Sequence, residues 1–329
     1  MLIAILSDIH SNHIALDFVI RDAKSRGVDE FWCLGDVIDF GWQPVEVLSA
    51  LGPLIKFENW VMGNHDACYA GILEPGKFKF GVESQIMMKH NKVLIDNSPI
   101  AKDYVKNFFS TSQQPPKMKI KDGMVCYLTH SGYDTGYRYP WFDTRPLDED
   151  AKNLFKQIKT HPVKNKSWKI WEETNSYMHI LFFGHTHLPV MAYFDETQGE
   201  MKIIKVRSGT VDLRKDCNNS RNIVINPGSV GMPRDLLPYP SYVIMDTKKR
   251  QIEFRRVREY NPELVIKGYS TVKRDIAKYL PDGLNELDAE VYIWNIENQI
   301  KKALHPNLQN ISQDWRDFYE GKNNVEQVE

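Results

Sequence analysis

A series of short segments that each end in Asp, Asn or His constrains the fold of this chain more than any other feature of its sequence. The first segment, residues 2–6, has five apolar residues and no charge, which predicts a buried β-strand. Asp8 and His10 follow it, and a spacing of two in extended backbone places both side chains on the same side. Four later segments also predict strands: residues 31–34, 55–62, 124–128 and 179–183.

Each of these five segments is followed by side chains of the metal-ligand type. The set contains two aspartates, one asparagine and four histidines: Asp8, His10, Asp36, Asn64, His130, His185 and His187. Any one of them alone is more typical of a strand-end cap or a surface residue. Strands that alternate with helices predict parallel pairing, and such sheets place ligands beyond the carboxyl ends of their strands. If the strands lie side by side, the seven side chains therefore converge on one site.

The segments between these strands predict helices. Ser11 or Asn12 can cap a helix that ends near Gly27, and residues 45–51 predict a second helix. From Pro189 the pattern changes to short alternating segments: residues 190–194, 201–206, 222–225, 241–246 and 251–258. These segments predict a second, mainly antiparallel sheet.

The C-terminal part of the chain has helical patterns at residues 271–280 and 286–304. We therefore expect a main domain over residues 1–260 and a helical extension over residues 261–329 that packs on the same domain.

Residues 131–178 form the least regular stretch, and their length exceeds an ordinary connection, so we expect a lid-like insertion. Arg138 and Arg145 lie here among Tyr, Trp and Phe residues. They could stack on a base and grip a phosphate, although an aromatic-packed lid explains them better. The lysines at residues 152–169 are typical of a solvated face and indicate nucleic acid only weakly.

The overall composition limits the partners and the compartment. Lys and Arg number 42 against 43 Asp and Glu, which leaves no global field to hold nucleic acid or an anionic membrane. The four cysteines include no Cys-x-x-Cys pair, which argues against a zinc ribbon or a disulfide framework. We find no signal peptide pattern and no segment that could span a bilayer, so we expect a cytoplasmic protein with no membrane partner.

The seven ligand-type side chains indicate two metal ions rather than one, because a single ion needs fewer donors. Mixed imidazole and carboxylate donors suit Mn, Fe, Zn, Co or Ni, of which we favour Mn, and the absence of thiolate argues against a purely structural zinc. Two ions about 3.5–4 Å apart clamp the oxygens of an in-line displacement and lower the pKa of a bound water. This is the chemistry of phosphate ester hydrolysis.

Five blocks of the sequence, taken together and in order, resemble the blocks of the calcineurin-like metallophosphoesterases: Asp8-x-His10, Gly35-Asp36-x-x-Asp39, Gly63-Asn64-His65-Asp66, His130 and Gly184-His185-x-His187. Residues 226–234 resemble a signature of the prokaryotic phosphodiesterase branch, often labelled diadenosine tetraphosphatase-like. The resemblance covers residues 1–258, the catalytic domain. It implies an α/β fold of four layers, in which two mixed β-sheets pack face to face and are flanked by helices.

The resemblance also implies a role for each residue of these blocks. Each metal ion would have three ligands of its own: Asp8, His10 and His187 for the first, and Asn64, His130 and His185 for the second. Asp36 would bridge the ions, and a hydroxide between them would attack phosphorus directly. His65 would stabilise or protonate the leaving oxygen, and Asp66 would accept a hydrogen bond from His65 and fix its tautomer. For Asp39 we favour a structural role over support of the site.

We therefore predict a phosphodiesterase that acts on a small or nucleotide-type phosphodiester. A phosphoprotein or phosphomonoester phosphatase would use the same metals, and the lysine-rich insertion motivates a nuclease, although nucleic acid is the less favoured partner. A protein-binding scaffold without catalysis is the non-enzyme alternative, which the complete ligand set disfavours. Arg234 could bind a substrate phosphate, with a solvated arginine or a structural ion pair as equal alternatives. No sequence feature indicates an oligomeric state.

Overall fold

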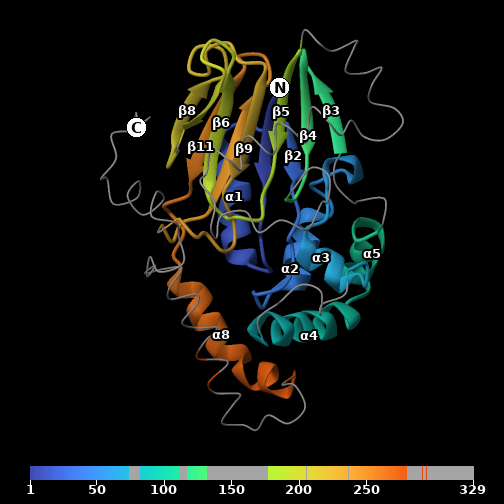
Figure 1. Ribbon diagram of the computed structural model, residues 1–329. Helices are drawn as coiled ribbons and strands as arrows, with labels where there is room; N and C mark the ends of the chain where they lie inside the picture. The colour runs from blue at the N-terminus through green and yellow to red at the C-terminus, as the bar shows by residue number, and fades with distance from the viewer. Residues whose placement is uncertain are drawn as a thin grey trace.

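Two β-sheets dominate the computed structural model, which describes residues 1–73, 82–110, 117–131, 177–204, 206–235, 237–279, 291 and 294. Within these residues the first sheet has five strands in the order β2-β1-β10-β11-β8, and the second has six in the order β3-β4-β5-β9-β6-β7. In Figure 1 the strands occupy the upper part of the view and most of the helices lie below them.

The strands of each sheet come from distant parts of the chain. The first sheet contains β1 (Leu2–Leu6), β2 (Glu30–Cys33), β8 (Gly209–Asp212), β10 (Ser241–Asp246) and β11 (Gln251–Arg256). The second contains β3 (Lys117–Lys121), β4 (Met124–Leu128), β5 (Met178–Phe182), β6 (Pro189–Asp195), β7 (Glu200–Ile204) and β9 (Asn222–Pro227). Both sheets are mixed: β1 pairs parallel with β2 and antiparallel with β10, whereas β5 pairs parallel with β4 and β9, and β6 antiparallel with β9. The fold that the resemblance implied is therefore confirmed.

The expected separation into an early parallel sheet and a late antiparallel sheet is wrong. β1 pairs with β10 in a register that joins Leu2 to Asp246, and β5 pairs with β9 in a register that joins His179 to Asn222. β1 is buried along most of its length, so both of its edges need partners inside the protein: the early strand β2 pairs with one edge and the late strand β10 with the other.

β1 separates two hydrophobic cores. Ala4 and Leu6 face a core shared with the helices, whereas Ile3 and Ile5 face the core between the two sheets. This alternation follows the two-residue period of a strand, and it explains why the whole segment is apolar.

The helices cover the first sheet and extend away from it: α1 (His13–Ser25), α2 (Pro44–Leu51), α3 (Asn64–Tyr69), α4 (Val82–Asp96), α5 (Pro99–Phe108) and α8 (Glu263–Ile276). The Asn12 side chain accepts a hydrogen bond from the Ala15 backbone N–H at 3.0 Å, which confirms one of the two predicted caps. None of the described helices combines the length and the apolar character that crossing a membrane requires.

The strand predicted at residues 55–62 does not form. The 3₁₀ helix η1 (Phe57–Asn59) interrupts the segment, and Trp60 makes a single parallel bridge to Cys33. The polar Glu58 and Asn59 break the apolar run, and the Asn59 amide donates to the Glu30 carboxylate at the adjacent edge strand.

Helix α8 joins the rest of the protein at α4 and at the loop after β2. Its Tyr269 hydroxyl donates to the backbone carbonyl of Phe40, and a Cβ added at Gly268 would lie 1.9 Å from Cζ2 of Trp42. A short 3₁₀ helix, η4 (Ala277–Tyr279), follows.

The division of the chain at residue 260 stays a prediction, and most of the predicted insertion, residues 131–178, lies outside the described residues.

Candidate metal centre

Loops that follow strands of both sheets meet at one end of the sheets. The loop after β1 is joined to the loop after β2 by hydrogen bonds from Asp8 N to Gly35 O (3.0 Å) and from Ile9 N to Asp36 O (2.8 Å). The loops after β4 and β5 are joined by a bond from Gly184 N to His130 O (2.9 Å). The His185 N–H donates to Asp8 Oδ2 at 3.1 Å and joins the two pairs of loops, so the strand ends that carry the seven predicted side chains converge on one site.

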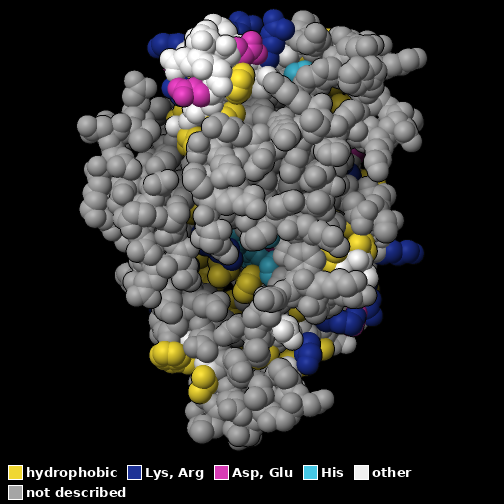
Figure 2. All heavy atoms as spheres, viewed as in Figure 1, with side chains coloured by type: hydrophobic (Ala, Val, Ile, Leu, Met, Phe, Trp, Pro, Cys, Tyr) yellow, Lys and Arg dark blue, Asp and Glu magenta, His cyan; other side chains and the backbone are white. Residues whose placement is uncertain are grey.

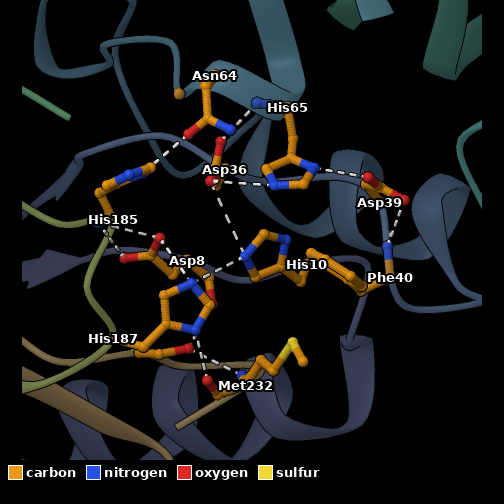
Figure 3. Close-up of polar contacts among 12 residues, drawn as sticks. Asp8, His10, Asp36, Asp39, Phe40, Asn64, His65, His185, His187 and Met232 are labelled. Carbon is orange, nitrogen blue, oxygen red and sulfur yellow. Dashed lines mark hydrogen bonds and ion pairs between the residues drawn. The ribbon is translucent and has the colours of Figure 1, made fainter. Parts of the chain in front are cut away.

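The first donor group consists of Asp8, His10 and His187, whose ligand atoms all lie within 4.8 Å of one another. His187 Nε2 is 3.3 Å from Asp8 Oδ1 and 3.2 Å from His10 Nε2. All three side chains are buried and point toward one another (Figure 3).

The second donor group consists of Asp36, His130 and His185, again with ligand atoms within 4.8 Å of one another. Asn64 joins this group, since its Oδ1 lies 3.0 Å from His130 Nε2 and 2.9 Å from His185 Nδ1. The amide oxygen of Asn64 can therefore act as a further donor to an ion held here.

The Asp36 carboxylate reaches both groups. Its Oδ2 lies 3.1 Å from His130 Nε2 and 3.9 Å from His10 Nε2. Its Oδ1 accepts a hydrogen bond from the His65 backbone N–H at 2.9 Å, which fixes the orientation of the carboxylate. This geometry suits a carboxylate shared between two ions.

The tautomers of the histidines test whether a cation fits. Three of them place Nδ1 against a backbone carbonyl: His10 against Ile38, His130 against Leu34 and His187 against Met232. A neutral imidazole that donates from Nδ1 has a lone pair on Nε2. The Nε2 lone pairs of His10 and His187 then face each other and repel. A cation bound between them would accept both lone pairs and remove the repulsion.

The charges at the site support the same conclusion. Burial, together with the neighbouring His130, lowers the pKa of His185 to about 3, and burial together with His187 lowers the pKa of His10 well below its ordinary value. Burial alone would raise the pKa of Asp36, but His130 and His65 hold it well below its ordinary value. Neutral imidazoles and ionised carboxylates are the protonation states that bind metals. His130 differs from His10 and His185: burial would lower its pKa, but Asp36 raises it to about 9, so an ion bound here would replace its proton.

Five of the seven side chains stand on left-handed backbone, at φ between 49° and 67°: Asp8, His10, Asp36, His185 and His187. This conformation costs an L-residue other than glycine roughly 1–2 kcal/mol. Such residues cluster at functional sites, where the surrounding structure holds them in place. Apolar periodicity does not detect this feature, because it reports burial and not φ.

The predicted partner of His65 is wrong. His65 Nδ1 lies 2.6 Å from Oδ2 of Asp39, not against Asp66. The Asp66 carboxylate instead accepts hydrogen bonds from the backbone N–H groups of Gly63 (3.0 Å) and Val37 (2.9 Å), because it lies in the first turn of α3 and faces the loop that precedes it. Asp39 thus supports the site directly, and Asp66 orders the backbone.

Arg234 is the predicted substrate-binding arginine that the structure describes. Its backbone N–H donates to the His187 carbonyl at 3.4 Å, its side chain is exposed, and burial together with the Arg234 charge lowers the pKa of His187. The adjacent Asp235 forms a buried ion pair with Arg256, which holds this loop in place. Arg138 and Arg145 lie outside the described residues.

The segment 226–234 supports the metal loops from behind. Asn226 Nδ2 donates to Gly184 O at 2.8 Å, and Ser229 Oγ donates to Asp8 O at 2.7 Å. The sequence assigned this segment to the site by resemblance alone, and the contacts show a physical role for it. On the face shown in Figure 2, histidine side chains are visible in a hollow beside hydrophobic and basic side chains.

A model of the calcineurin-like phosphoesterase superfamily domain matches residues 1–250 of the chain. The chain belongs to the calcineurin-like phosphoesterase superfamily. This superfamily is dinuclear metal-dependent, and the two donor groups are its candidate metal-binding residues here. The chain is accordingly a phosphoric ester hydrolase.

Relatives of this calcineurin-like phosphoesterase match it over most of its length. The uncharacterized protein MJ0912 of Methanocaldococcus jannaschii is 29% identical over 293 residues, which cover 87% of this chain and 96% of the relative. A metallophosphoesterase from Sphaerobacter thermophilus has a similar fold, with a TM-score of 0.62 and 21% identity over 92% of this chain and 99% of that one. The hypothetical protein PH1004 from Pyrococcus horikoshii gives a TM-score of 0.56 and 14% identity, over 92% and 97% of the two chains.

Proposed function

We propose that this chain is a phosphodiesterase that hydrolyses a small or nucleotide-type phosphodiester with two divalent ions, of which Mn²⁺ is the favoured one. The observation that carries the proposal is the position of the Asp36 carboxylate, which belongs to the second donor group, also approaches His10 of the first and lies beside His65. When bound, the ions would supply Lewis acidity and an activated water.

The residues of the chain would divide the remaining tasks. Asp8, His10 and His187 would hold one ion and Asn64, His130 and His185 the other. His65 Nε2 lies 4.0 Å from Asp36 Oδ2, so its ring faces the site while Nδ1 donates to Asp39. In its doubly protonated form His65 also carries a proton on Nε2, which it can give to the leaving oxygen, and the neutral ring that remains keeps its Nδ1–H on Asp39.

The surroundings of His65 and of the first donor group suit an organic phosphodiester. The Phe40 ring lies 5.0 Å from the His65 ring, so the leaving group would have an apolar neighbour. Arg234 adds a positive charge near the first donor group, where it could bind a phosphate oxygen.

The choice between diesterase and monoesterase is tested by comparing bis(p-nitrophenyl) phosphate with p-nitrophenyl phosphate in the presence of Mn²⁺. We expect the diester to have the higher kcat/KM. A higher value for the monoester would instead support the phosphatase alternative. The nuclease alternative depends on residues 152–169, outside the described residues, and digestion of single-stranded DNA decides it.

Two variants test the roles of the chain's own residues. His65→Ala should lower kcat by about 10²-fold or more, as expected for loss of a general acid, and should keep its bound metal. Asp36→Asn should lose both activity and metal affinity. If His65→Ala loses metal as well, the role of His65 proposed here is wrong.

We also propose a cytoplasmic location, which fluorescence microscopy of a tagged chain would test.

A further inference from the structure

Helix α4 places two buried polar side chains, Ser84 and Asn91, against the loop that carries Asp39. They are 1% and 0% exposed, respectively. We propose that Ser84 and Asn91 are positioning residues, which hold the Asp39–His65 pair in the orientation that protonates the leaving group. This proposal rests on the proposed function of His65, and neither residue belongs to the five blocks that identify the superfamily.

Ser84 acts on the carboxylate of Asp39. Its hydroxyl donates to Asp39 Oδ2 at 2.5 Å, and the same oxygen lies 2.6 Å from His65 Nδ1. The other oxygen, Oδ1, accepts from the Phe40 backbone N–H at 2.6 Å. Three donors therefore meet this fully buried carboxylate and fix its plane. The Asp39 carboxylate in turn orients the His65 ring through Nδ1–H, so that Nε2, which must carry the transferred proton, faces the site.

Asn91 joins two loops of the metal centre. Its Oδ1 accepts from Ser11 Oγ at 2.6 Å and from Asp39 N at 3.0 Å, and its Nδ2 donates to Gly41 O at 2.8 Å. Ser11 belongs to the loop after β1, and Asp39 and Gly41 belong to the loop after β2. Three of the four hydrogen bonds that the amide can make are therefore used to hold these loops together.

The backbone at these contacts needs such support. Ser11 and Asp39 have φ values of 51° and 73°, in the left-handed region that costs ordinary residues energy. Ser84 and Asn91 are seven positions apart, which is two helical turns, so both side chains lie on the same face of α4. Ile86 and Met87 of the same helix instead join the hydrophobic core. One face of α4 thus serves the polar site while its other buried residues serve packing.

The test uses variants of Ser84, since Asn91→Ala removes three hydrogen bonds and can prevent folding. Ser84→Ala removes the hydroxyl, Ser84→Thr retains it, and Lys89→Ala is the matched control at an exposed position of the same helix. The substrates are bis(p-nitrophenyl) phosphate and diphenyl phosphate, whose leaving groups differ in their need for a proton.

We expect Ser84→Ala to lower kcat on diphenyl phosphate by about tenfold, part of the contribution of a general acid, and to affect bis(p-nitrophenyl) phosphate much less. KM and metal content should stay unchanged, and Ser84→Thr should restore the rate. Equal losses on both substrates, no loss on either, or loss of metal would overturn the proposal.

A second measurement separates this proposal from the proposed function. In the metal-free protein, the proton on His65 Nδ1 should give a downfield NMR signal, assigned by its loss in His65→Ala. The signal should persist in Ser84→Thr and Lys89→Ala and should shift or broaden in Ser84→Ala. An unchanged signal in Ser84→Ala would overturn the positioning role even if the wild type hydrolyses neither diester.

Discussion

Gly63 is predicted to be irreplaceable because of space and not because of backbone conformation. Its φ of −85° and ψ of 180° are extended values that any residue adopts. A Cβ at this position would, however, lie 1.9 Å from Asp36 Oδ1 and 2.3 Å from Asp36 N. Gly63→Ala must therefore displace the Asp36 carboxylate, which reaches both donor groups.

The cost follows from the contacts that would be lost. Forcing a methyl group into a packed site costs roughly 1–3 kcal/mol, and the hydrogen bond from His65 N to the charged Asp36 contributes roughly 1.5–3 kcal/mol. We expect the free energy of unfolding to fall by about 3–5 kcal/mol. A displacement near 1 Å at a catalytic group also lowers activity by about 100-fold.

Gly71 provides the matched control, because its properties are the reverse. Its φ is +71°, yet nothing lies within 4 Å of an added Cβ. Gly71→Ala should lower the free energy of unfolding by about 1 kcal/mol and leave activity unchanged. Urea denaturation and hydrolysis of bis(p-nitrophenyl) phosphate with Mn²⁺ measure both effects. If Gly63→Ala is as active as Gly71→Ala, the crowding argument is refuted.

Three further predictions concern stability and metal dependence. Asp22 accepts hydrogen bonds from Tyr242 (2.6 Å) and Arg255 (3.1 Å); burial would raise its pKa, but these bonds hold it below its ordinary value. The ionised Asp22 therefore stabilises the fold above the pKa it has in the unfolded chain, and this stabilisation is lost as pH falls through its pKa in the folded protein. Asp22→Asn should lower the free energy of unfolding by about 2 kcal/mol near neutral pH and by progressively less below about pH 4, as measured by urea denaturation. Tyr269→Phe should lower stability by about 1 kcal/mol in a thermal melt, because the Phe40 carbonyl loses its donor; no change would argue against docking of α8 at this loop. A chelator should abolish hydrolysis, and Mn²⁺ at about 100 times its Kd should restore it and add about 2.7 kcal/mol of stability; hydrolysis that survives exhaustive chelation would contradict a metal-dependent reaction.

The apolar segments and the ligand blocks could be predicted from the sequence because each depends on local chemistry. β1 forms over residues 2–6 as expected, since a strand buried on both faces must be apolar throughout. The cap of α1 is equally local, because the Asn12 side chain accepts a hydrogen bond from the backbone N–H of Ala15, three residues later.

Pairing and side-chain partners could not be predicted, because they depend on distant parts of the chain. The apolar periodicity of a segment does not indicate that β10 pairs with one edge of β1, nor which sheet a strand joins. β3 was missed because Lys117–Lys121 is a lysine-rich strand at the edge of its sheet, where exposed charge replaces the apolar pattern. Asp66 is the sequence neighbour of His65, whereas the loop after β2 brings Asp39 to the ring.

The left-handed backbone at the metal centre has a consequence for engineering this enzyme. Five candidate ligand positions, among them Asp8 and His185, hold residues that their φ values disfavour, so glycine would relieve strain there and at the same time remove a candidate ligand. Directed evolution for heat resistance in metal-free buffer would therefore enrich variants that melt later and no longer hydrolyse their substrate. If the metal is present during selection, the stability that a glycine gains from relaxed backbone is offset by the stability lost with ion binding. Such a selection would keep the candidate ligands.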